Sequence, residues 1–155
     1  MPTVVFALSL NRILDGAGRP FFGWLSDRIG RENTMGIAFL FEAVAIAGLV
    51  ASRNDAMLFV ILSAVVFFGW GEIFSLFPST LTDTFGTKNA TTNYGFLYMA
   101  QGVGSVLGAP VAAYIAERTG SWLPVFSIII GLDILTGLLA LFVLKPMRTA
   151  YAASK

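Results

Sequence analysis

Three charged side chains occur at helical spacing inside an apolar stretch near the start of the chain. Arg12, Asp15 and Arg19 lie in the segment 3–25, at positions i, i+3 and i+7. In an α-helix this spacing places all three side chains on one face. An ion inside a bilayer costs on the order of 2.5–3.5 kcal/mol on insertion scales. If the segment spans a membrane, the charged face is therefore expected to border protein or a water-filled cavity.

Two interpretations of this charged face remain open. In the first, the three residues belong to a closed network of ion pairs that ties helices together. In the second, Asp15 holds Arg19, whose planar guanidinium can bind a carboxylate through two hydrogen bonds. Counted from Leu25 at 1.5 Å per residue, Asp15 lies about 15 Å deep and Arg12 about 20 Å deep. Arg12 could reach the opposite membrane edge, so it ranks below Arg19 as an anion ligand.

Other apolar segments carry single polar or aromatic side chains at similar depth. Gln101 can donate and accept hydrogen bonds, and Trp70 and Phe74 are one helical turn apart. The two aromatic side chains either contact lipid and other helices or wall a small cavity opposite a buried arginine. Glu42, Glu72 and Asp133 are single acids within apolar segments, and each could pair with an arginine or carry a proton.

The composition predicts an integral membrane protein and excludes several other classes. Of the 155 residues, 56% are hydrophobic and 12% are charged, whereas a soluble domain has about 25% charged residues. A net charge of +1 gives no basis for nucleic-acid binding. The chain has no Cys and no His, which removes thiol nucleophiles, most metal sites and the usual general base. We therefore expect no enzyme, no cofactor and no metal site.

Five apolar segments approach the length of about 20 residues that a bilayer core requires. They are 3–25, 34–52, 56–79, 92–116 and 122–144. Because backbone polar groups in lipid must be satisfied within each segment, the sequence predicts an all-α membrane bundle with five transmembrane helices. We expect one partial bundle over 1–155, with a tail at 145–155.

The basic residues predict the orientation of this bundle. One side carries six basic residues in its loops and tail: Arg28, Arg31, Lys88, Lys145, Arg148 and Lys155. The other side carries Arg53 and Arg118, each near an acid. By the positive-inside rule, the first side and the C-terminus are expected in the cytoplasm. The predicted location is the inner (plasma) membrane of the cell.

The loop "GWLSDRIGRE" after the first segment resembles a motif of the major facilitator superfamily, Gly-x-x-x-Asp-Arg-x-Gly-Arg. The matching residues are Gly23, Asp27, Arg28, Gly30 and Arg31. In the family this loop is a conformational latch between inward- and outward-facing states. Gly23 is expected to allow close helix approach and Gly30 a tight turn, while the arginines are expected to pair with acids or helix C-termini. Gly104 and Gly108 form a G-x-x-x-G pattern, for which ordinary packing within the bundle is expected.

The resemblance implies a position within a twelve-helix fold. The family carries the loop after its second and eighth helices, and four apolar segments follow it here. The chain is therefore similar to helices eight to twelve, and its implied partners are the lipid bilayer and the missing N-terminal half, or a companion chain. The alternatives are a truncated, transport-inactive fragment and a structural membrane subunit.

Two further stretches resemble carboxylate transporters within this superfamily. "DGAGRPFFG" is similar to an eighth-helix segment of monocarboxylate transporters, in which the residues at Asp15 and Arg19 handle substrate and proton. "FFGWGEIFSLFPSTLTDTFG" and "NYGFLYMAQG" resemble helices ten and eleven of oxalate:formate antiporters. The implied function is transport of small organic anions by alternating access.

The antiporter resemblance also implies individual roles. In that family an eighth-helix arginine and an eleventh-helix lysine hold oxalate, and tenth-helix aromatics close the cavity. Arg19 matches the arginine and Trp70 a cavity aromatic, whereas Phe74 stands where a tyrosine is found and Gln101 where the lysine is found. With one cation fewer, we expect a monocarboxylate to be preferred over oxalate.

Overall fold

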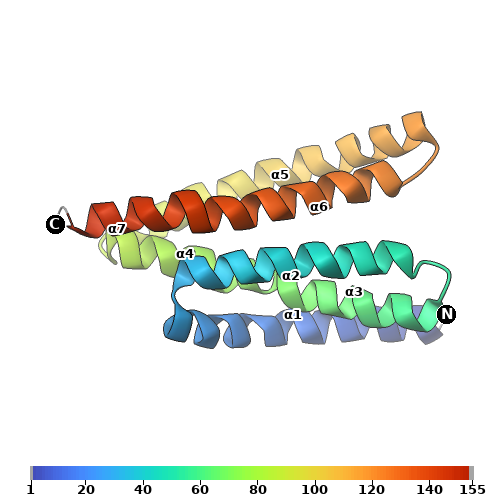
Figure 1. Cartoon of the computed structure of the whole chain (residues 1–155), viewed down its shortest axis with the longest axis horizontal. Helices are drawn as coiled ribbons and strands as arrows, with labels where there is room; N and C mark the ends of the chain where they lie inside the picture. The colour runs from blue at the N-terminus through green and yellow to red at the C-terminus, as the bar shows by residue number, and fades with distance from the viewer. Residues whose placement is uncertain (1, 154–155) are drawn as a thin grey trace.

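The computed structural model describes residues 2–153, and every element within that range is helical. The elements are α1 (Pro2–Ile29), α2 (Arg31–Ala51), α3 (Ala56–Trp70), α4 (Glu72–Phe85), α5 (Ala90–Thr119), α6 (Leu123–Leu139), the π-helical turn η1 (Ala140–Leu144) and α7 (Lys145–Ala153). Since α3 continues into α4, and α6 continues through η1 into α7, the chain forms five long rods (Figure 1). The predicted all-α class is confirmed.

Four stretches of the described chain are long and apolar enough to cross a membrane. They are Arg31–Ala51, Ala56–Phe85, Ala90–Thr119 and Leu123–Ala153. α1 is not among them, because Arg12, Asp15 and Arg19 interrupt its apolar run. The least apolar rod is therefore the one that carries the charged face.

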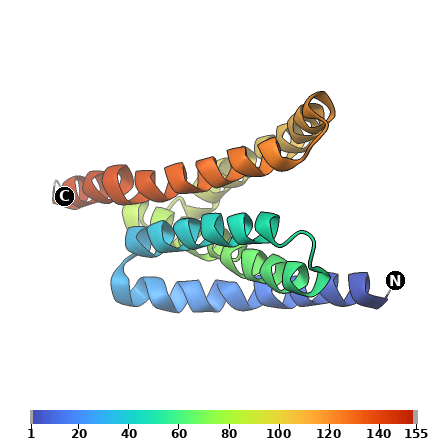
Figure 2. The same cartoon turned by 45° about the vertical axis from the view of Figure 1, so that its right-hand side comes forward.

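The rods alternate in direction, so the connections collect at two ends of the molecule. The α1–α2 turn, the α4–α5 connection and the C-terminal end of the chain lie at one end (Figure 1). The N-terminal end and the α2–α3 and α5–α6 connections lie at the other (Figures 1 and 2). We call the first end the latch end, because it contains the loop with Gly30.

α1 crosses the α3–α4 rod at unusually close range. A Cβ atom on Gly71 would lie 2.6 Å from the Asp15 carbonyl oxygen, and one on Gly18 would overlap the Phe68 carbonyl oxygen. Only glycine fits at these two positions, because the two helix backbones lie too close together to leave room for a Cβ atom. The same crossing coincides with the interruption between α3 and α4, where the Gly71 N–H bonds to the Gly69 carbonyl.

The core lies between α1, α2, α4 and η1. Its buried residues are Phe22, Met35, Ala38, Phe39, Leu76 and Ala140. α2 is the central rod, because it packs against α1, α3, α4 and α6. Such a core brings four rods that are distant in sequence into one compact group.

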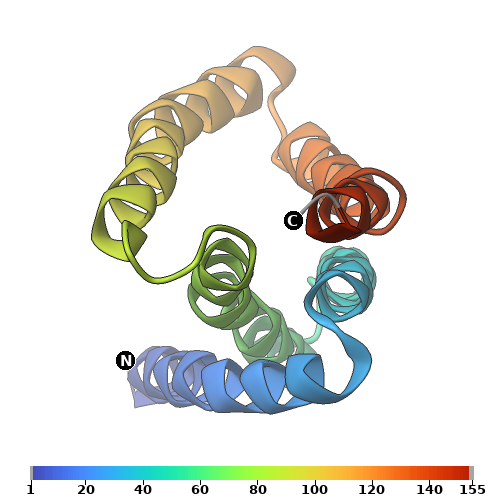
Figure 3. The same cartoon turned by 90° about the vertical axis from the view of Figure 1, so that its left-hand side faces the viewer.

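α5 stands apart from this group and packs mainly against α4 and α6 (Figure 3). A Cβ on Gly104 or Gly108 would meet nothing within 4 Å. The packing role expected for most of the glycines in the apolar segments is not seen for this pair among the described rods. The reason is that no other described rod covers that face of α5.

Candidate functional site

Four of the predicted site residues lie together where α1 meets the α3–α4 rod. Arg19 Nη2 is 3.2 Å from Asp15 Oδ2, and the Arg19 guanidinium carbon is 4.6 Å from the centroid of the Phe74 ring. The Trp70 ring packs edge-on against Phe74, with centroids 6.0 Å apart. We call these four residues the Arg19 cluster.

The two charges of the Arg19 cluster differ in exposure. The Asp15 side chain is 9% exposed, whereas that of Arg19 is 47% exposed. Asp15 precedes Arg19 by one helical turn, the favourable order for an acid and a base on one helix. Because both residues belong to α1, this pair does not tie two rods together. It holds the guanidinium over Phe74 and leaves part of it open.

Some hydrogen-bonding capacity in the cluster is unused. The single hydrogen bond described for the Arg19 guanidinium is the one to Asp15, although a guanidinium has five N–H donors. Asp15 Oδ1 is buried and has no described partner. The arrangement can therefore accept an anion on the open side of Arg19 without first breaking the ion pair.

Gln101 and Arg12, the other two residues predicted for the anion site, are not part of the Arg19 cluster in this structure. Gln101 is exposed on α5, and its side chain makes no hydrogen bond among the described residues. Arg12 is exposed on α1 and likewise has no ion pair in the described chain. The structure brings together the arginine, its acid and the two aromatic residues, but not the amide or the second arginine.

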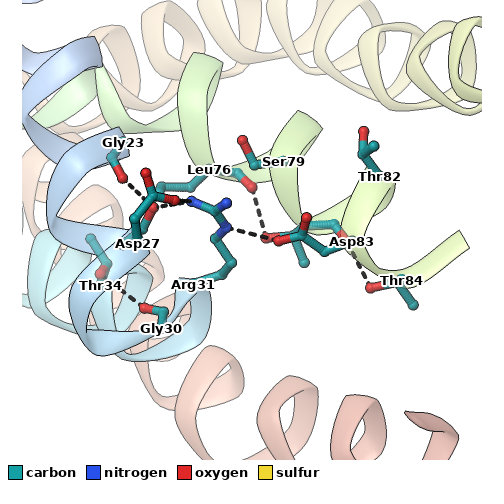
Figure 4. Close-up of polar contacts among 12 residues, drawn as sticks. Gly23, Asp27, Gly30, Arg31, Thr34, Leu76, Ser79, Thr82, Asp83 and Thr84 are labelled. Carbon is teal, nitrogen blue, oxygen red and sulfur yellow. Dashed lines mark hydrogen bonds and ion pairs between the residues drawn. The ribbon is translucent and has the colours of Figure 1, made fainter. Parts of the chain in front are cut away.

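Arg31 joins three rods at the latch end (Figure 4). Its Nη1 lies 2.7 Å from Asp27 Oδ1 of α1, and its Nε donates to Asp83 Oδ2 of α4 at 2.9 Å. Arg31 also donates to the Ser26 hydroxyl. Gly30 begins this arrangement with a φ of 92°, a value that favours glycine. The tight turn expected at Gly30 is therefore present.

A second set of contacts at the latch end fixes the C-terminal helix. Arg148 forms an ion pair with Glu32 of α2 and donates from Nε to the Thr84 hydroxyl of α4 at 2.7 Å. The Lys145 ammonium donates to Asn33 Oδ1 at 2.9 Å. α1, α2, α4 and α7 are thus linked by side chains at one end.

Two expectations for this loop need correction or refinement. A Cβ on Gly23 would meet nothing within 4 Å, so the expected close helix approach is absent among the described rods. Arg28 does not pair with an acid there; its guanidinium carbon lies 4.3 Å from the centroid of the Trp24 ring. Arg31 alone of the two loop arginines makes the expected ion pairs in the described chain.

Sequence reasoning missed the partners of the latch-end arginines. Asp83 and Glu32 were not singled out, and Arg148 was counted only as a basic residue of the tail. The available signal was an acid near the predicted cytoplasmic end of the first three apolar segments (Asp27, Glu32 and Asp83), on the same side as the basic residues. This signal indicates ion pairs but does not identify which residues pair.

The chain belongs to the Major Facilitator Superfamily, which it matches over residues 2–155. This is a family of membrane transporters rather than enzymes, and the predicted membership is confirmed. Over 146 residues the chain is 36% identical to the oxalate:formate antiporter of Oxalobacter formigenes, covering 93% of the chain and 34% of that relative.

Two further relatives are similar to shorter parts of the chain. An uncharacterized MFS-type transporter of Escherichia coli (strain K12), YhjX, is 33% identical over 100 residues, with 64% of the chain and 25% of the relative covered. Monocarboxylate transporter 12 of Rattus norvegicus is 28% identical over 125 residues, with 78% of the chain and 26% of the relative covered. The chain therefore spans about a third or less of the length of these relatives.

Proposed function

We propose that this chain forms the C-terminal part of a transporter that moves small carboxylate anions across a membrane by alternating access. The observation that carries the proposal is the half-exposed guanidinium of Arg19, held by Asp15 and placed over Phe74. The names of the relatives support the same class of substrate, since one is an oxalate:formate antiporter and another a monocarboxylate transporter. The site would lie in an inner (plasma) membrane, with the chain's C-terminus in the cytoplasm.

Arg19 is the anion anchor in this proposal, and Asp15 orients it and serves as its charge partner. Trp70 and Phe74, which pack against each other and beside Arg19, would form one wall of the substrate cavity. An arginine suits the role because its two parallel N–H donors match the two oxygens of a carboxylate. Arg12 is a secondary cation on the same rod, farther from the aromatic wall.

The remaining helices of the twelve-helix fold would complete the cavity, either in the same polypeptide or as a companion chain. We call that assembly the complete transporter. The uncovered face of α5, which carries Gly104 and Gly108, supports the need for such a partner. Substrate sites in transporters of this general kind lie near the bilayer midplane, between two repeats. In the complete transporter, Gln101 is the neutral ligand of the substrate on α5.

The latch end would control the change between the inward-facing and outward-facing states of the transporter. Arg31 bridges Asp27 and Asp83, and so holds the end of α1 against the end of α4. Opening the bundle at this end requires these contacts to break, so their strength sets the balance between the two states. This gives the loop of Gly23, Asp27, Arg28, Gly30 and Arg31 the role of a conformational latch.

The expected selectivity follows from charge. A dianion held by one arginine and one amide gains less Coulomb energy than a dianion held by two cations in a cavity of low dielectric. We therefore expect formate to compete better than oxalate against labelled formate in the complete transporter. Gln101→Lys should shift the preference towards oxalate, because it restores a second cation.

Competition against labelled formate, with a panel of mono- and dicarboxylates, tests the proposal. Strong competition by monocarboxylates, reversed in Gln101→Lys, is the expected result. The selectivity argument fails if oxalate competes best and Gln101→Lys changes nothing. The carboxylate assignment itself fails if no carboxylate in the panel competes.

A further inference from the structure

Three acidic side chains from three different rods lie within electrostatic range of one another inside the bundle. Glu42 comes from α2, Glu72 is the first residue of α4, and Asp133 comes from α6. Their carboxyl groups lie within Coulomb range of one another: Glu42 interacts with Asp133, and Glu72 interacts with both. We call these three residues the acid trio.

Glu42 and Glu72 of the acid trio are buried and Asp133 is half-buried, and three of the trio's carboxyl oxygens are buried without a described hydrogen-bond donor. The Glu72 residue is 0% exposed, and neither of its carboxyl oxygens has a described partner. Glu42 is also buried, and Asp133 Oδ2 is a further buried oxygen without a described partner. A buried polar atom without a partner is unusual in a folded protein and needs an explanation.

No described cation faces the acid trio from the elements packed around it. On α1 the relevant charges are Asp15 and Arg19, which pair with each other, while Arg12 is exposed. α3 has no charged residue within Ala56–Trp70. The described cations of α1 are therefore either paired or exposed, and α3 contributes none.

The charged residues of α5 and α7 do not compensate the acid trio either. The charged residues of α5 are confined to its far end, at Glu117 and Arg118. On α7, Lys145 and Arg148 contact Asn33 and Glu32 at the latch end. The other titratable groups of these elements are Tyr94, Tyr98 and Tyr114 on α5, Tyr151 on α7 and Asp83 at the latch end of α4. The trio is thus a group of acids without a compensating charge among the described residues.

A proton is the ligand that best fits these facts. Three carboxylates in a buried site would repel one another, and desolvation costs several kcal/mol for each ion. Protonation removes one of these charges, which lowers both the repulsion among the carboxylates and the cost of desolvating them. A bound proton therefore reduces both costs in a single step.

Glu72 is placed to link this proton to the anion site. It follows Gly71, at which α1 crosses closely enough that a Cβ would lie 2.6 Å from the Asp15 carbonyl oxygen. The close crossing therefore places Glu72 next in sequence to the position where the α3–α4 rod touches the backbone of Asp15, the partner of Arg19.

We propose that Glu42, Glu72 and Asp133 form a proton-binding site, so that carriage of the carboxylate anion is coupled to carriage of a proton. The inference rests on the proposed transport function. In each cycle one carboxylate of the trio takes up H⁺ from one side and returns it to the other, and no other bond forms or breaks. The site is separate from the Asp15–Arg19 pair, because its members lie on α2, α4 and α6.

The test uses the complete transporter in proteoliposomes and two measurements with labelled formate. The first is exchange at equal pH on both sides, which needs no net movement of protons. The second is accumulation driven by a pH gradient. Glu72→Gln keeps the shape of the side chain but cannot ionise, so we expect exchange to persist and gradient-driven accumulation to be lost. Glu117→Gln, the same change at an exposed position, should leave both measurements unchanged.

The two measurements separate failure of the inference from failure of the proposed function. Absence of formate exchange in the unsubstituted transporter counts against the proposed function. Exchange with full pH-driven accumulation in Glu72→Gln, Glu42→Gln and Asp133→Asn overturns the proton site. Accumulation that follows a sodium gradient instead of a pH gradient overturns it as well.

A direct measurement covers the case in which Glu72→Gln does not fold. Infrared spectra of the unsubstituted full chain in lipid, recorded over a range of pH, report the carbonyl stretch of protonated carboxyl groups. We expect a band that titrates with pH and is shielded from solvent exchange, and that weakens in Glu42→Gln. Absence of any such band in the unsubstituted chain overturns the proposal.

Discussion

Gly18→Ala tests the close crossing that places the Arg19 cluster beside the α3–α4 rod. The added methyl group would overlap the Phe68 carbonyl oxygen and lie 3.5 Å from the Gly71 Cα. Both obstacles are backbone atoms, so no side-chain rotation can relieve the overlap. The rods must move apart, and they would carry Phe74 and Trp70 away from Arg19.

The size of the effect follows from two opposing contributions. Overpacking a well-packed core costs typically about 1–3 kcal/mol. Replacing glycine by alanine inside a helix returns up to about 1 kcal/mol through helix propensity. Because the obstacle here is rigid, we expect the upper part of the first range and a net destabilisation of about 2 kcal/mol. Gly16→Ala is the matched control, since a Cβ on Gly16 meets nothing within 4 Å.

Reversible unfolding of the full chain in mixed micelles, followed by tryptophan fluorescence, measures the free energy of unfolding of both variants. Gly18→Ala should unfold at a lower denaturant fraction than the unsubstituted chain. Gly16→Ala should match the unsubstituted chain or exceed it by up to about 1 kcal/mol. Equal stability of the two variants would refute the close crossing and, with it, the position assigned to the Arg19 cluster.

Two further pairs of substitutions, each a test variant with its control, probe the latch end with the same unfolding assay. Arg31→Ala removes the link between Asp27 and Asp83 and should lower the free energy of unfolding by about 1–2 kcal/mol, since charge-assisted hydrogen bonds are lost from a half-buried network. Arg28→Ala, the control, should cost less. Equal losses in the two variants would contradict the contacts described for the latch end. Gly30→Ala forces a side chain into a positive-φ conformation and should lower the free energy of unfolding by about 1–3 kcal/mol. Gly23→Ala, whose Cβ meets nothing within 4 Å, should leave it nearly unchanged. A larger loss of stability in Gly23→Ala than in Gly30→Ala would contradict the turn.

The features that the sequence predicted best are those set by local spacing. Long apolar runs predicted helices, and the i, i+4 spacing of Asp15 and Arg19 predicted that they could pair along one helix. Gly30 was predicted to allow a turn because glycine alone accepts positive φ readily. Each of these inferences needs only the geometry of a single rod or turn.

Features set by contacts between rods were not predictable in the same way. Asp83 is 52 residues from Arg31, and nothing in the local sequence indicates that the two meet. Gly23 and Gly104 show the opposite case, since no described residue packs against them; a small residue permits close packing but does not require it. The pattern of small residues could not distinguish these positions from Gly18, where two backbones do meet.

The candidate site was predicted in part for the same reason. Trp70 and Phe74 share one helix face, but their position beside Arg19 depends on the crossing at Gly18. Gln101 belongs to α5, which packs mainly against α4 and α6 and does not bring Gln101 to Arg19 in the described chain. Its proposed role therefore rests on the family resemblance and on the charge argument rather than on a contact.

Exchange of labelled formate by the complete transporter tests most directly whether Arg19 is the anion anchor. Arg19→Ala should abolish exchange while the protein remains inserted in the membrane, because no other described cation is held by Asp15. Arg118→Ala, which removes an exposed arginine stacked on Tyr114 at the end of α5, should retain exchange. Near-normal exchange in Arg19→Ala would contradict the assignment of the transport site.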